Sequence, residues 1–407
     1  MGQTLPVQPR IAPEDPQWWL DDVEAAYAWL RTEDPVHRWS DGHWVVAAYD
    51  DIREVSRDPA RFSSAKGVLV NDPKRVPNSP AAMAPSILEL DPPEHPRYRK
   101  IVSRAFTPKA VTRLEPRIRE LTRQVFDAAP VGENLDFVDH IAAPLPLLVI
   151  AELLGMQDAD QTQFRAWSDE CIKAADGGRA DMEILGKFVQ FMAEGIADHR
   201  ANPREDILQL IVDAEVDGER LSDGELIVFC MSLLVAGNET TRNLVSGGTI
   251  VLAEHPDQRA WLADAPGERG AHAVEEMLRW VTPIKAFART ATADTELAGQ
   301  AIAAGDYVVL LYASGNRDAS AFGPTADRFD VTRPPDPAHV AFGFGGHLCL
   351  GAGLARIEAR IVFEELLTRF PEYELTGEPA YLQSTLINGV ERLPAVLTAA
   401  AAEAEQA

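Results

Sequence analysis

One glycine-rich stretch, residues 341–351, constrains what this chain can fold into more than any other part of the sequence. It contains a single thiol, Cys349, among glycines at positions 343, 345, 346 and 351. Glycine has no Cβ, so the backbone can turn sharply there and approach a flat partner closely. A helical pattern follows from residue 351 to about residue 370, and the first N–H groups of a helix favour a thiolate. The stretch therefore predicts a metal-binding thiolate on a turn that leads into a helix.

Three other interpretations of this stretch compete with a metal-binding thiolate. A lone cysteine is often a buried structural residue, but such a residue does not need four flanking glycines. Gly351, Gly353 and Arg356 imitate a dinucleotide-binding loop, although no strand pattern leads into them and an arginine ends the motif. A zinc site needs further ligands, and no Cys-x-x-Cys or second histidine lies near His347 and Cys349.

The pattern Phe342-x-x-Gly345-x-His347-x-Cys349-x-Gly351 resembles the haem-binding signature of the cytochrome P450 family. The resemblance implies a helix-rich fold, mainly α with a minor β region, in which Cys349 ligates the iron of haem b (iron protoporphyrin IX). An aromatic ring and amide hydrogen bonds near the thiolate would tune the potential of that iron. The activity implied is that of a monooxygenase, which inserts one atom of dioxygen into a C–H bond. Three residues are then expected beside the cofactor: Phe342, Gly343 and His347.

Two basic segments resemble further haem ligands of the same family. His95 and Arg99 are spaced i, i+4 and share one helix face. Taken alone, such a pair is more often a solvated helix end than a binding site. It resembles the family's His-x-x-x-Arg motif, whose side chains bind the haem propionates, and Arg289 matches another propionate ligand of the family.

The longest helix is predicted to begin at a capping box. Ser222 and Glu225 have the spacing of such a box, and the helix should run to Glu254, just before His255-Pro256. Residues 226–237 are nearly all apolar, but a polar run follows over residues 238–243. Because an unpaired polar group in a core costs about 1–3 kcal/mol, this run needs a purpose.

The polar run resembles the oxygen-activation motif of the P450 family. We expect the Thr240 hydroxyl to bond back to the carbonyl of Ala236, with Gly237 leaving space beside it for a small ligand. The resemblance of Ala236-Gly237-x-Glu239-Thr240 implies that Thr240 and Glu239 are catalytic and deliver protons during oxygen activation. It places Ala236 and Gly237 against the cofactor. The alternative is a polar cluster that is satisfied within the core.

A buried ion network is also implied by the resemblance. Glu276 and Arg279 stand i, i+3 on a helix predicted over residues 272–281. Arg328, in the sequence Asp327-Arg328-Phe329, resembles the third member of the family's Glu-Arg-Arg network. We assign these residues to folding support rather than to chemistry.

The substrate site is expected to be apolar. Prolines and polar residues break any periodicity over residues 66–89, as in a long functional loop, and the corresponding loop of the family covers the haem. An ordinary surface loop is the alternative. Lys285 either binds a substrate carboxylate or, as we expect, points to solvent. The residues predicted to line the substrate pocket are Val70, Ile87, Leu233, Ala236, Phe287 and Ile387.

An apolar pocket predicts a lipophilic small molecule as the substrate. The run over residues 235–243 is similar to that of soluble bacterial members that oxidise sterols, terpenoids or branched lipids. Tailoring of a polyketide or another secondary metabolite is the alternative within the family. A non-catalytic haem protein that binds ligands or senses gas is the alternative from another class, although Thr240 and Glu239 favour catalysis.

Charge bears on the partners of the chain. The formal net charge of −25 argues against nucleic acid, which is bound by basic surfaces. Residues 97–123 nevertheless carry nine Lys or Arg, a basic segment that suits an acidic docking partner. Family resemblance makes that partner a ferredoxin or flavodoxin-like electron donor with its reductase, because no flavin or iron–sulfur motif is fused to the chain.

The 407 residues are expected to form a single cytochrome P450 catalytic domain, with an N-terminal extension over residues 1–16 and a frayed tail over residues 399–407. We expect no membrane span and a cytoplasmic location. Cysteines at 171, 230 and 349 are an odd, scattered set, which suits a reducing compartment. Gly177-Gly178 is expected to act as a hinge between helices.

Overall fold

The computed structural model describes residues 8–21, 23–75, 85–155, 161–175, 180–204, 206–215 and 218–400. Several expectations therefore fall outside the described residues. They are the Gly177-Gly178 hinge, the first seven residues of the N-terminal extension, residues 401–407 of the tail, and residues 76–84 of the long loop.

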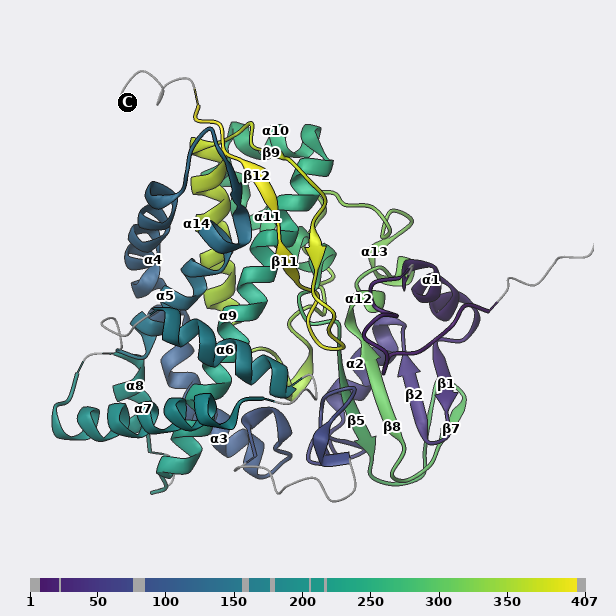
Figure 1. The fold of residues 1–407 in the computed structure, drawn as a ribbon. Helices are drawn as coiled ribbons and strands as arrows, with labels where there is room; N and C mark the ends of the chain where they lie inside the picture. The colour runs from purple at the N-terminus through teal and green to yellow at the C-terminus, as the bar shows by residue number, and fades with distance from the viewer. Residues whose placement is uncertain are drawn as a thin grey trace, which may run out of the picture.

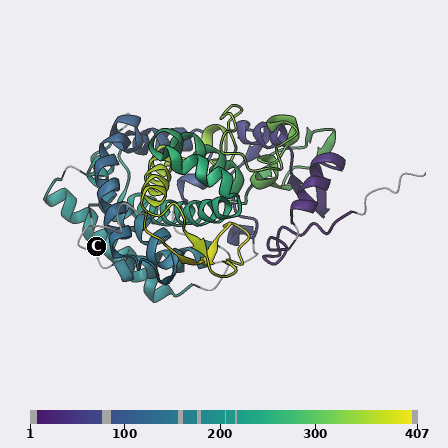
Figure 2. The same cartoon turned by 90° about the horizontal axis from the view of Figure 1, so that it is seen from above.

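A large helical part lies beside a smaller β-rich part (Figures 1 and 2). The expected fold, mainly α with a minor β region, is confirmed. Within the described ranges, no helix is both long enough and apolar enough to cross a membrane. The longer helices are α1 (Val23–Glu33), α2 (Tyr49–Arg57), α3 (Glu94–Val102), α4 (Pro108–Ala128), α5 (Pro144–Leu153), α6 (Gln161–Ala175), α7 (Met182–Ala201), α9 (Asp223–Glu254), α10 (Pro256–Asp264), α11 (Pro266–Val281) and α14 (Ala352–Arg369). The short ones are η1 (Pro73–Arg75), η2 (Ile87–Glu89), η3 (Ser103–Phe106), η4 (Val138–Ala142), α8 (Ile207–Val212), α12 (Tyr312–Gly315), α13 (Ala319–Phe322) and η5 (Gly345–His347).

Helix α9 runs through the middle of the helical part (Figure 1). The predicted capping box is confirmed: the Ser222 hydroxyl accepts from the Glu225 amide at 3.3 Å, and a Glu225 carboxylate oxygen accepts from the Ser222 amide at 2.8 Å. The helix ends at Glu254, as predicted. It contacts α5, α6, α7, α10, α11 and α14, so most of its surface is covered by other helices.

The main sheet has five strands in the order β1-β2-β8-β5-β3. Its strands are β1 (Val36–Ser40), β2 (His43–Val46), β3 (Phe62–Ser63), β5 (Ala286–Ala291) and β8 (Tyr307–Leu311). Ala288 and Val309 pack into one apolar cluster, whereas Phe287 and Val308 pack into another on the opposite face. Because side chains alternate along a strand, Arg289 lies on the Phe287 face and Thr290 on the Ala288 face.

Three small sheets complete the β structure of the described residues. The first has the order β4-β12-β9, the second pairs β10 with β11, and the third pairs β6 with β7. Their strands are β4 (Asn134–Asp136), β9 (Glu374–Leu375), β12 (Pro394–Val396), β10 (Ala380–Tyr381), β11 (Val390–Arg392), β6 (Thr295–Leu297) and β7 (Gln300–Ile302).

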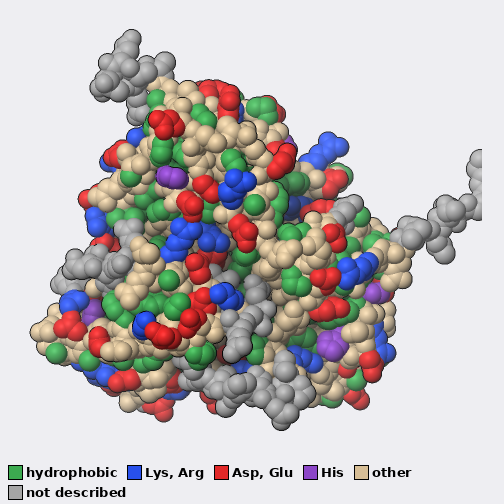
Figure 3. Space-filling view, in the orientation of Figure 1, with side chains coloured by type: hydrophobic (Ala, Val, Ile, Leu, Met, Phe, Trp, Pro, Cys, Tyr) green, Lys and Arg blue, Asp and Glu red, His purple; other side chains and the backbone are tan. Residues whose placement is uncertain are grey.

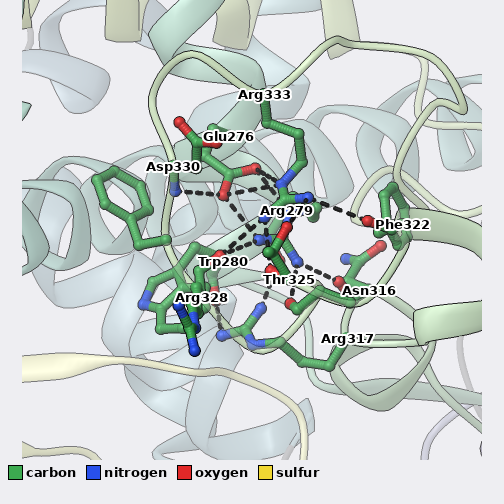
Figure 4. A network of polar contacts seen from close by, with 12 residues as sticks. Glu276, Arg279, Trp280, Asn316, Arg317, Phe322, Thr325, Arg328, Asp330 and Arg333 are labelled. Carbon is green, nitrogen blue, oxygen red and sulfur yellow. Dashed lines mark hydrogen bonds and ion pairs between the residues drawn. The ribbon is translucent and has the colours of Figure 1, made fainter.

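A buried ion network joins α11 to the segment that precedes the thiol (Figure 4). Glu276 and Arg279 form a two-pronged pair, with Nε and Nη2 of Arg279 each 2.7 Å from a Glu276 oxygen. Arg279 also donates to the carbonyls of Asn316, Ala326 and Arg328, at 2.6, 2.8 and 2.9 Å. The expected pairing of Glu276 with Arg279 is therefore confirmed, and Arg279 also fixes three backbone carbonyls by hydrogen bonds.

The third member of this network is Arg333, and the prediction of Arg328 was wrong. Nε of Arg333 lies 3.2 Å from a Glu276 oxygen, whereas the Arg328 side chain is exposed. Arg328 contributes only its backbone carbonyl, which accepts from both Arg279 and Arg333 (Figure 4). The error has a physical reason: the backbone in this irregular segment turns the side chain of residue 328 outward and leaves its carbonyl facing in.

Candidate functional site

The turn that carries Cys349 is held in a conformation that requires glycine. Gly343 and Gly345 have positive φ angles of 70° and 71°. A Cβ on Gly345 would lie 2.4 Å from the backbone oxygen of Ser56 in α2, a distance that no side chain tolerates. The Cys349 amide donates to the Phe342 carbonyl at 2.9 Å, which closes the turn. The absence of a Cβ at Gly345 is therefore used for close packing against α2, and the predicted approach to a flat partner stays a prediction.

The thiol of Cys349 is placed at the start of α14 but is not ionised by the turn alone. Although the side chain is solvent-accessible, protein atoms surround it closely enough that burial raises the pKa of the thiol. The amides of Gly351 and Ala352 and the guanidinium groups of Arg99 and Arg356 lower that pKa, but to a smaller extent. A bound metal cation would supply the positive charge that a thiolate here still needs.

Of the two phenylalanines beside the thiol, only Phe342 faces the helical core. Its ring is partly buried against that core, under the guanidinium of Arg356 at 4.6 Å. Phe344 instead lies between Arg53 and Arg57 of α2, each 4.6 Å from its ring. Of the two rings, that of Phe342 therefore packs on the side of the helical core, and its role as a screen for the thiol stays a prediction.

Four basic side chains form a cluster near the thiol: His95, Arg99, Arg289 and His347. The rings of His95 and His347 are 4.0 Å apart, and Arg99 donates to the carbonyl of Leu348 at 2.6 Å. His95 is 4% exposed and Arg289 is 5% exposed. The structure thus brings together residues from α3, β5 and η5 that are far apart in the sequence.

This cationic cluster has no ion-pair partner in the part of the chain that the structure describes. Burial, followed by the charges of Arg289, His95 and Arg99, lowers the pKa of His347 to about 3. Burial and the nearby Arg99 charge likewise lower the pKa of His95, whose buried Nε2 has no hydrogen-bond partner. Among the described residues, no carboxylate forms an ion pair with any of the four. The cluster therefore fits a ligand with carboxylates, as haem has in its two propionates, next to a thiol that fits its iron.

Helix α9 presents an accessible stripe in the middle of its length. Leu233, Ala236 and Thr240 are the partly exposed or exposed residues at helical spacing on that stripe. The Thr240 hydroxyl donates to the Ala236 carbonyl at 2.6 Å, as predicted. The prediction of open space beside Gly237 was wrong, because a Cβ there would lie 2.6 Å from the Ile150 side chain. Gly237 instead lets α5 pack closely against α9.

Glu239 is fully buried on another side of the same helix. Its Oε2 atom lies 2.6 Å from a guanidinium nitrogen of Arg242, an ion pair whose geometry is poor for a hydrogen bond. Burial raises the pKa of Glu239 to about 7, against the opposing charge of Arg242. The hydroxyl of Thr240 is bonded to Ala236 and not to this carboxyl. The two residues predicted to act together are adjacent but not directly hydrogen-bonded.

Arg242 is a residue of this site that the sequence analysis left without a role. Its spacing from Glu239, i to i+3, was the available signal, but such pairs are common on helices. A second unassigned contact fixes the neighbouring turn, where the Asn238 amide donates to the Ser168 hydroxyl of α6 at 2.9 Å.

The folded protein should become less stable as the pH rises, because of Glu239. In the unfolded chain this carboxyl loses its proton near pH 4.5, whereas the folded protein holds it up to about pH 7. The folded state thus binds more protons between these values, so the free energy of unfolding decreases as the pH rises through them. The decrease is at most on the order of 3 kcal/mol. Denaturant unfolding of the wild type and of Glu239→Gln between pH 5 and pH 8 measures it: the variant should lose this slope, and an unchanged slope would contradict the assignment.

The residues predicted to line the substrate pocket do not all face open space. Ile87 and Leu233 pack at the edge of the helical core, Phe287 at one face of the main sheet and Val70 at the other. All four are partly buried, whereas Ile387 is only 2% exposed and its backbone bridges to Ile284.

The prediction that Lys285 points to solvent was wrong. The residue is 4% exposed, and its ammonium group donates to the Ser384 carbonyl at 3.0 Å. The same group lies 5.5 Å from the ring centroid of Trp19. Segments from both ends of the chain therefore enclose this lysine.

Comparison with known proteins agrees with these features. Residues 271–379, which include the ion network and the thiol turn, match the family described as Cytochrome P450. The chain is 40% identical to a methyl-branched lipid omega-hydroxylase of Mycobacterium tuberculosis, over 93% of this chain and 92% of that protein. It is also 40% identical to linalool 8-monooxygenase of Pseudomonas putida, over 91% and 94% of the two chains.

A solved structure has the same fold. A cytochrome P450 of Mycobacterium marinum in complex with pseudoionone superposes with a TM-score of 0.85 at 36% identity, covering 97% of this chain and 100% of that one. Likeness over nearly the whole length, together with a thiol turn and a cationic cluster that fit haem, means that this chain belongs to the cytochrome P450 family and is a monooxygenase whose cofactor is haem b.

Proposed function

We propose that this monooxygenase hydroxylates a branched, lipophilic small molecule: a methyl-branched lipid or a terpenoid, with sterols in the same class. The observation that carries the proposal is the 40% identity, over more than nine-tenths of the chain, to proteins that act on a methyl-branched lipid and on linalool. The accessible α9 stripe supports it, because Leu233 and Ala236 beside Thr240 offer apolar surface to such a molecule.

We assign the haem contacts as follows. Bound haem supplies the activation of dioxygen and the transfer of one oxygen atom to a C–H bond. Cys349 holds the iron, and the cationic cluster of His95, Arg99, Arg289 and His347 holds the propionates. Phe342 and Gly343 lie on the thiol turn and would contact the cofactor there, and Ala236 and Gly237 would contribute the α9 backbone to its site.

Thr240 and Glu239 are assigned to proton delivery. A general acid works best when its pKa lies near the working pH, and the pKa of Glu239 is about 7. Arg242 holds the carboxyl in place at 2.6 Å. Because the Thr240 hydroxyl donates a hydrogen bond to the Ala236 carbonyl, its oxygen lone pairs remain available to accept a hydrogen bond from water.

Loss of the Thr240 hydroxyl should uncouple electron use from product formation. We expect Thr240→Ala to consume the electron donor at a near wild-type rate but to form at least about tenfold less hydroxylated product, with hydrogen peroxide making up the difference. Thr240→Ser keeps a hydroxyl and should stay coupled. Parallel measurement of oxygen, peroxide and product decides the matter: full coupling in Thr240→Ala would remove the proton-delivery role.

The substrate class is tested by product analysis. The haem-containing protein is incubated with a methyl-branched fatty acid, with linalool, with an unbranched fatty acid of equal length and with a macrolide-type polyketide, and the products are identified by mass spectrometry. We expect hydroxylation of the branched compounds, at a chain end, in preference to the unbranched acid. Equal or better turnover of a macrolide-type polyketide would favour the tailoring alternative.

The electron donor is proposed to be a ferredoxin or flavodoxin-like protein that docks on part of the basic segment. Acidic and basic side chains are interspersed over the face in Figure 3, and much of the segment is already neutralised. Arg97 pairs with Glu219, and Arg117, Arg119 and Arg123 pair with carboxylates of α4, α5 and α14. Four exposed cations have no ion-pair partner among the described residues: Lys100, Arg104, Lys109 and Arg113.

Reversal of these charges should weaken docking. We expect Lys109→Glu and Arg113→Glu together to raise the KM for a ferredoxin about tenfold or more at low salt, with a smaller effect at high salt, since exposed charges are screened. Lys187→Glu on α7 is the matched control, because it changes an exposed lysine elsewhere. An unchanged KM in the double variant would contradict docking at this surface.

Two organisational features are proposed with the function. The chain from about residue 17 to residue 398 is proposed to act as one catalytic domain, which the 97% coverage by the pseudoionone-bound P450 supports. A cytoplasmic location is supported by three free cysteines, two of them buried.

A further inference from the structure

A surface hollow beside the main sheet carries positive charge in an acidic protein. Its lining is Ala65, Lys66, Lys74, Arg75, Thr290 and Gly305, and its volume is about 460 Å³. The chain has a formal net charge of −25, so three basic side chains around one hollow are unexpected. None of the residues assigned to haem contributes to it. Thr290 and Arg289 lie on opposite faces of β5, so the hollow and the cationic cluster are separate sites.

Arg75 is held with its hydrogen-bonding edge available. Its guanidinium carbon lies 3.7 Å from the centroid of the Tyr307 ring, and that ring is fixed by a hydrogen bond from its hydroxyl to the Leu69 carbonyl. One nitrogen of Arg75 is 3.4 Å from the Thr290 hydroxyl, a long contact that a ligand can readily replace. Stacking covers one face of the guanidinium and leaves edge N–H groups, which match the two oxygens of a carboxylate.

The carboxylates near the hollow are already engaged. Glu89 pairs with Lys74 at 2.6 Å. The oxygens of Asp72 accept from the amides of Val68 and Lys74, at 2.8 and 2.9 Å. In the part of the chain that the structure describes, no carboxylate forms an ion pair with Lys66 or Arg75. Two cations therefore remain for a ligand.

The hollow adjoins the segment proposed to contact substrate. Lys74 lines the hollow and pairs with Glu89, and this ion pair joins η1 to η2, whose Ile87 packs at the edge of the helical core. We propose that Lys66 and Arg75 bind the carboxylate of a branched fatty acid, whose hydrocarbon chain leads past Ile87 toward the oxidation site in the helical part. This inference rests on the proposed function, because it names the acidic member of the same substrate class. A free inorganic anion has the same chemistry and is separated by the test below.

The test compares a methyl-branched fatty acid with its methyl ester, which has the same chain without the charge. Binding to the haem-containing, full-length protein is measured by titration calorimetry. We expect the acid to bind about tenfold more tightly than the ester, as a charged, two-pronged hydrogen bond allows. Arg75→Gln should remove this preference, and Lys66→Gln should reduce it. Arg75→Lys keeps the charge but loses the second hydrogen bond, so its preference for the acid should lie between those of the wild type and Arg75→Gln.

Controls separate the possible outcomes. Lys187→Gln makes the same change of charge on α7, where the lysine pairs with Glu183 at 2.7 Å, and should retain the preference for the acid. Equal binding of acid and ester by the wild type would overturn the carboxylate site but leave the proposed function standing. A loss of affinity for both ligands in Arg75→Gln would also overturn it, as a structural effect. Arg75-dependent binding of inorganic phosphate without any preference for the acid would assign the site to free anions. If neither lipid binds, the proposed function fails as well.

Discussion

Replacing Cys349 by alanine should abolish both hydroxylation and the spectral signature of a haem thiolate. The reduced wild-type protein should show a strongly red-shifted Soret band with carbon monoxide, because an electron-rich sulfur ligates the iron. Cys349→Ala leaves no sulfur on the turn, and the nearby His347 of η5 is already packed in the cationic cluster, with its ring centroid 4.0 Å from that of His95. We therefore expect an ordinary Soret band or loss of haem. Absorption spectra of the dithionite-reduced proteins with and without carbon monoxide measure this.

The other two cysteines provide the control for this experiment. Cys171 and Cys230 are buried in α6 and α9, and burial raises the pKa of each thiol, to about 11 and about 12. Cys171→Ala and Cys230→Ala should keep the red-shifted band, and each should lower only the stability of the protein, because each removes a buried side chain. A red-shifted band that survived in Cys349→Ala would mean that another residue ligates the iron, and the assignment of the thiol turn would be wrong.

The second large effect is expected on stability, from Arg279→Ala. This change leaves the carboxylate of Glu276, which is 2% exposed, with Arg333 as its remaining ion-pair partner, and it removes the Arg279 hydrogen bonds to three carbonyls. Removing one partner of a buried pair costs about 3–5 kcal/mol. The free energy of unfolding, from denaturant titration of the haem-containing protein, should fall by that amount.

Two neighbouring arginines provide matched variants. Arg333→Ala removes the weaker contact to Glu276 and should cost about 2 kcal/mol. Arg328→Ala removes an exposed side chain while keeping the carbonyl that the network uses, so its effect should stay within about 0.5 kcal/mol. If Arg328→Ala were as destabilising as Arg333→Ala, the arrangement in Figure 4 would be wrong in its third member.

Features set by local chemistry could be predicted from the sequence. Both ends of α9 were predicted, because a capping box at Ser222 and the proline after His255 act within one turn of the helix. The back-bond from Thr240 to Ala236 was predicted for the same reason. The thiol turn was recognised because its glycines are required by the backbone itself, as the Gly345 contact with Ser56 demonstrates.

Features set by distant segments could not be predicted. Lysine is rarely buried, so solvent was the reasonable expectation for Lys285, but Trp19 and Ser384 enclose it from opposite ends of the sequence. Likewise, nothing in the sequence around Gly237 indicates that Ile150 of α5 occupies the space beside it. The choice between Arg328 and Arg333 depended on the path of an irregular segment, which has no periodicity to guide a prediction.

The cationic cluster makes the folding and the degradation of the chain depend on the supply of haem. His95 and Arg289 are buried, Arg99 and His347 are partly exposed, and none of the four pairs with a carboxylate among the described residues, so the two propionates of haem should contribute to folding as well as to chemistry. Chains made when haem is scarce should be loose around α3 and the thiol turn and should be degraded sooner. The amount of enzyme in the cell would then follow the rate of porphyrin synthesis, without any dedicated regulator.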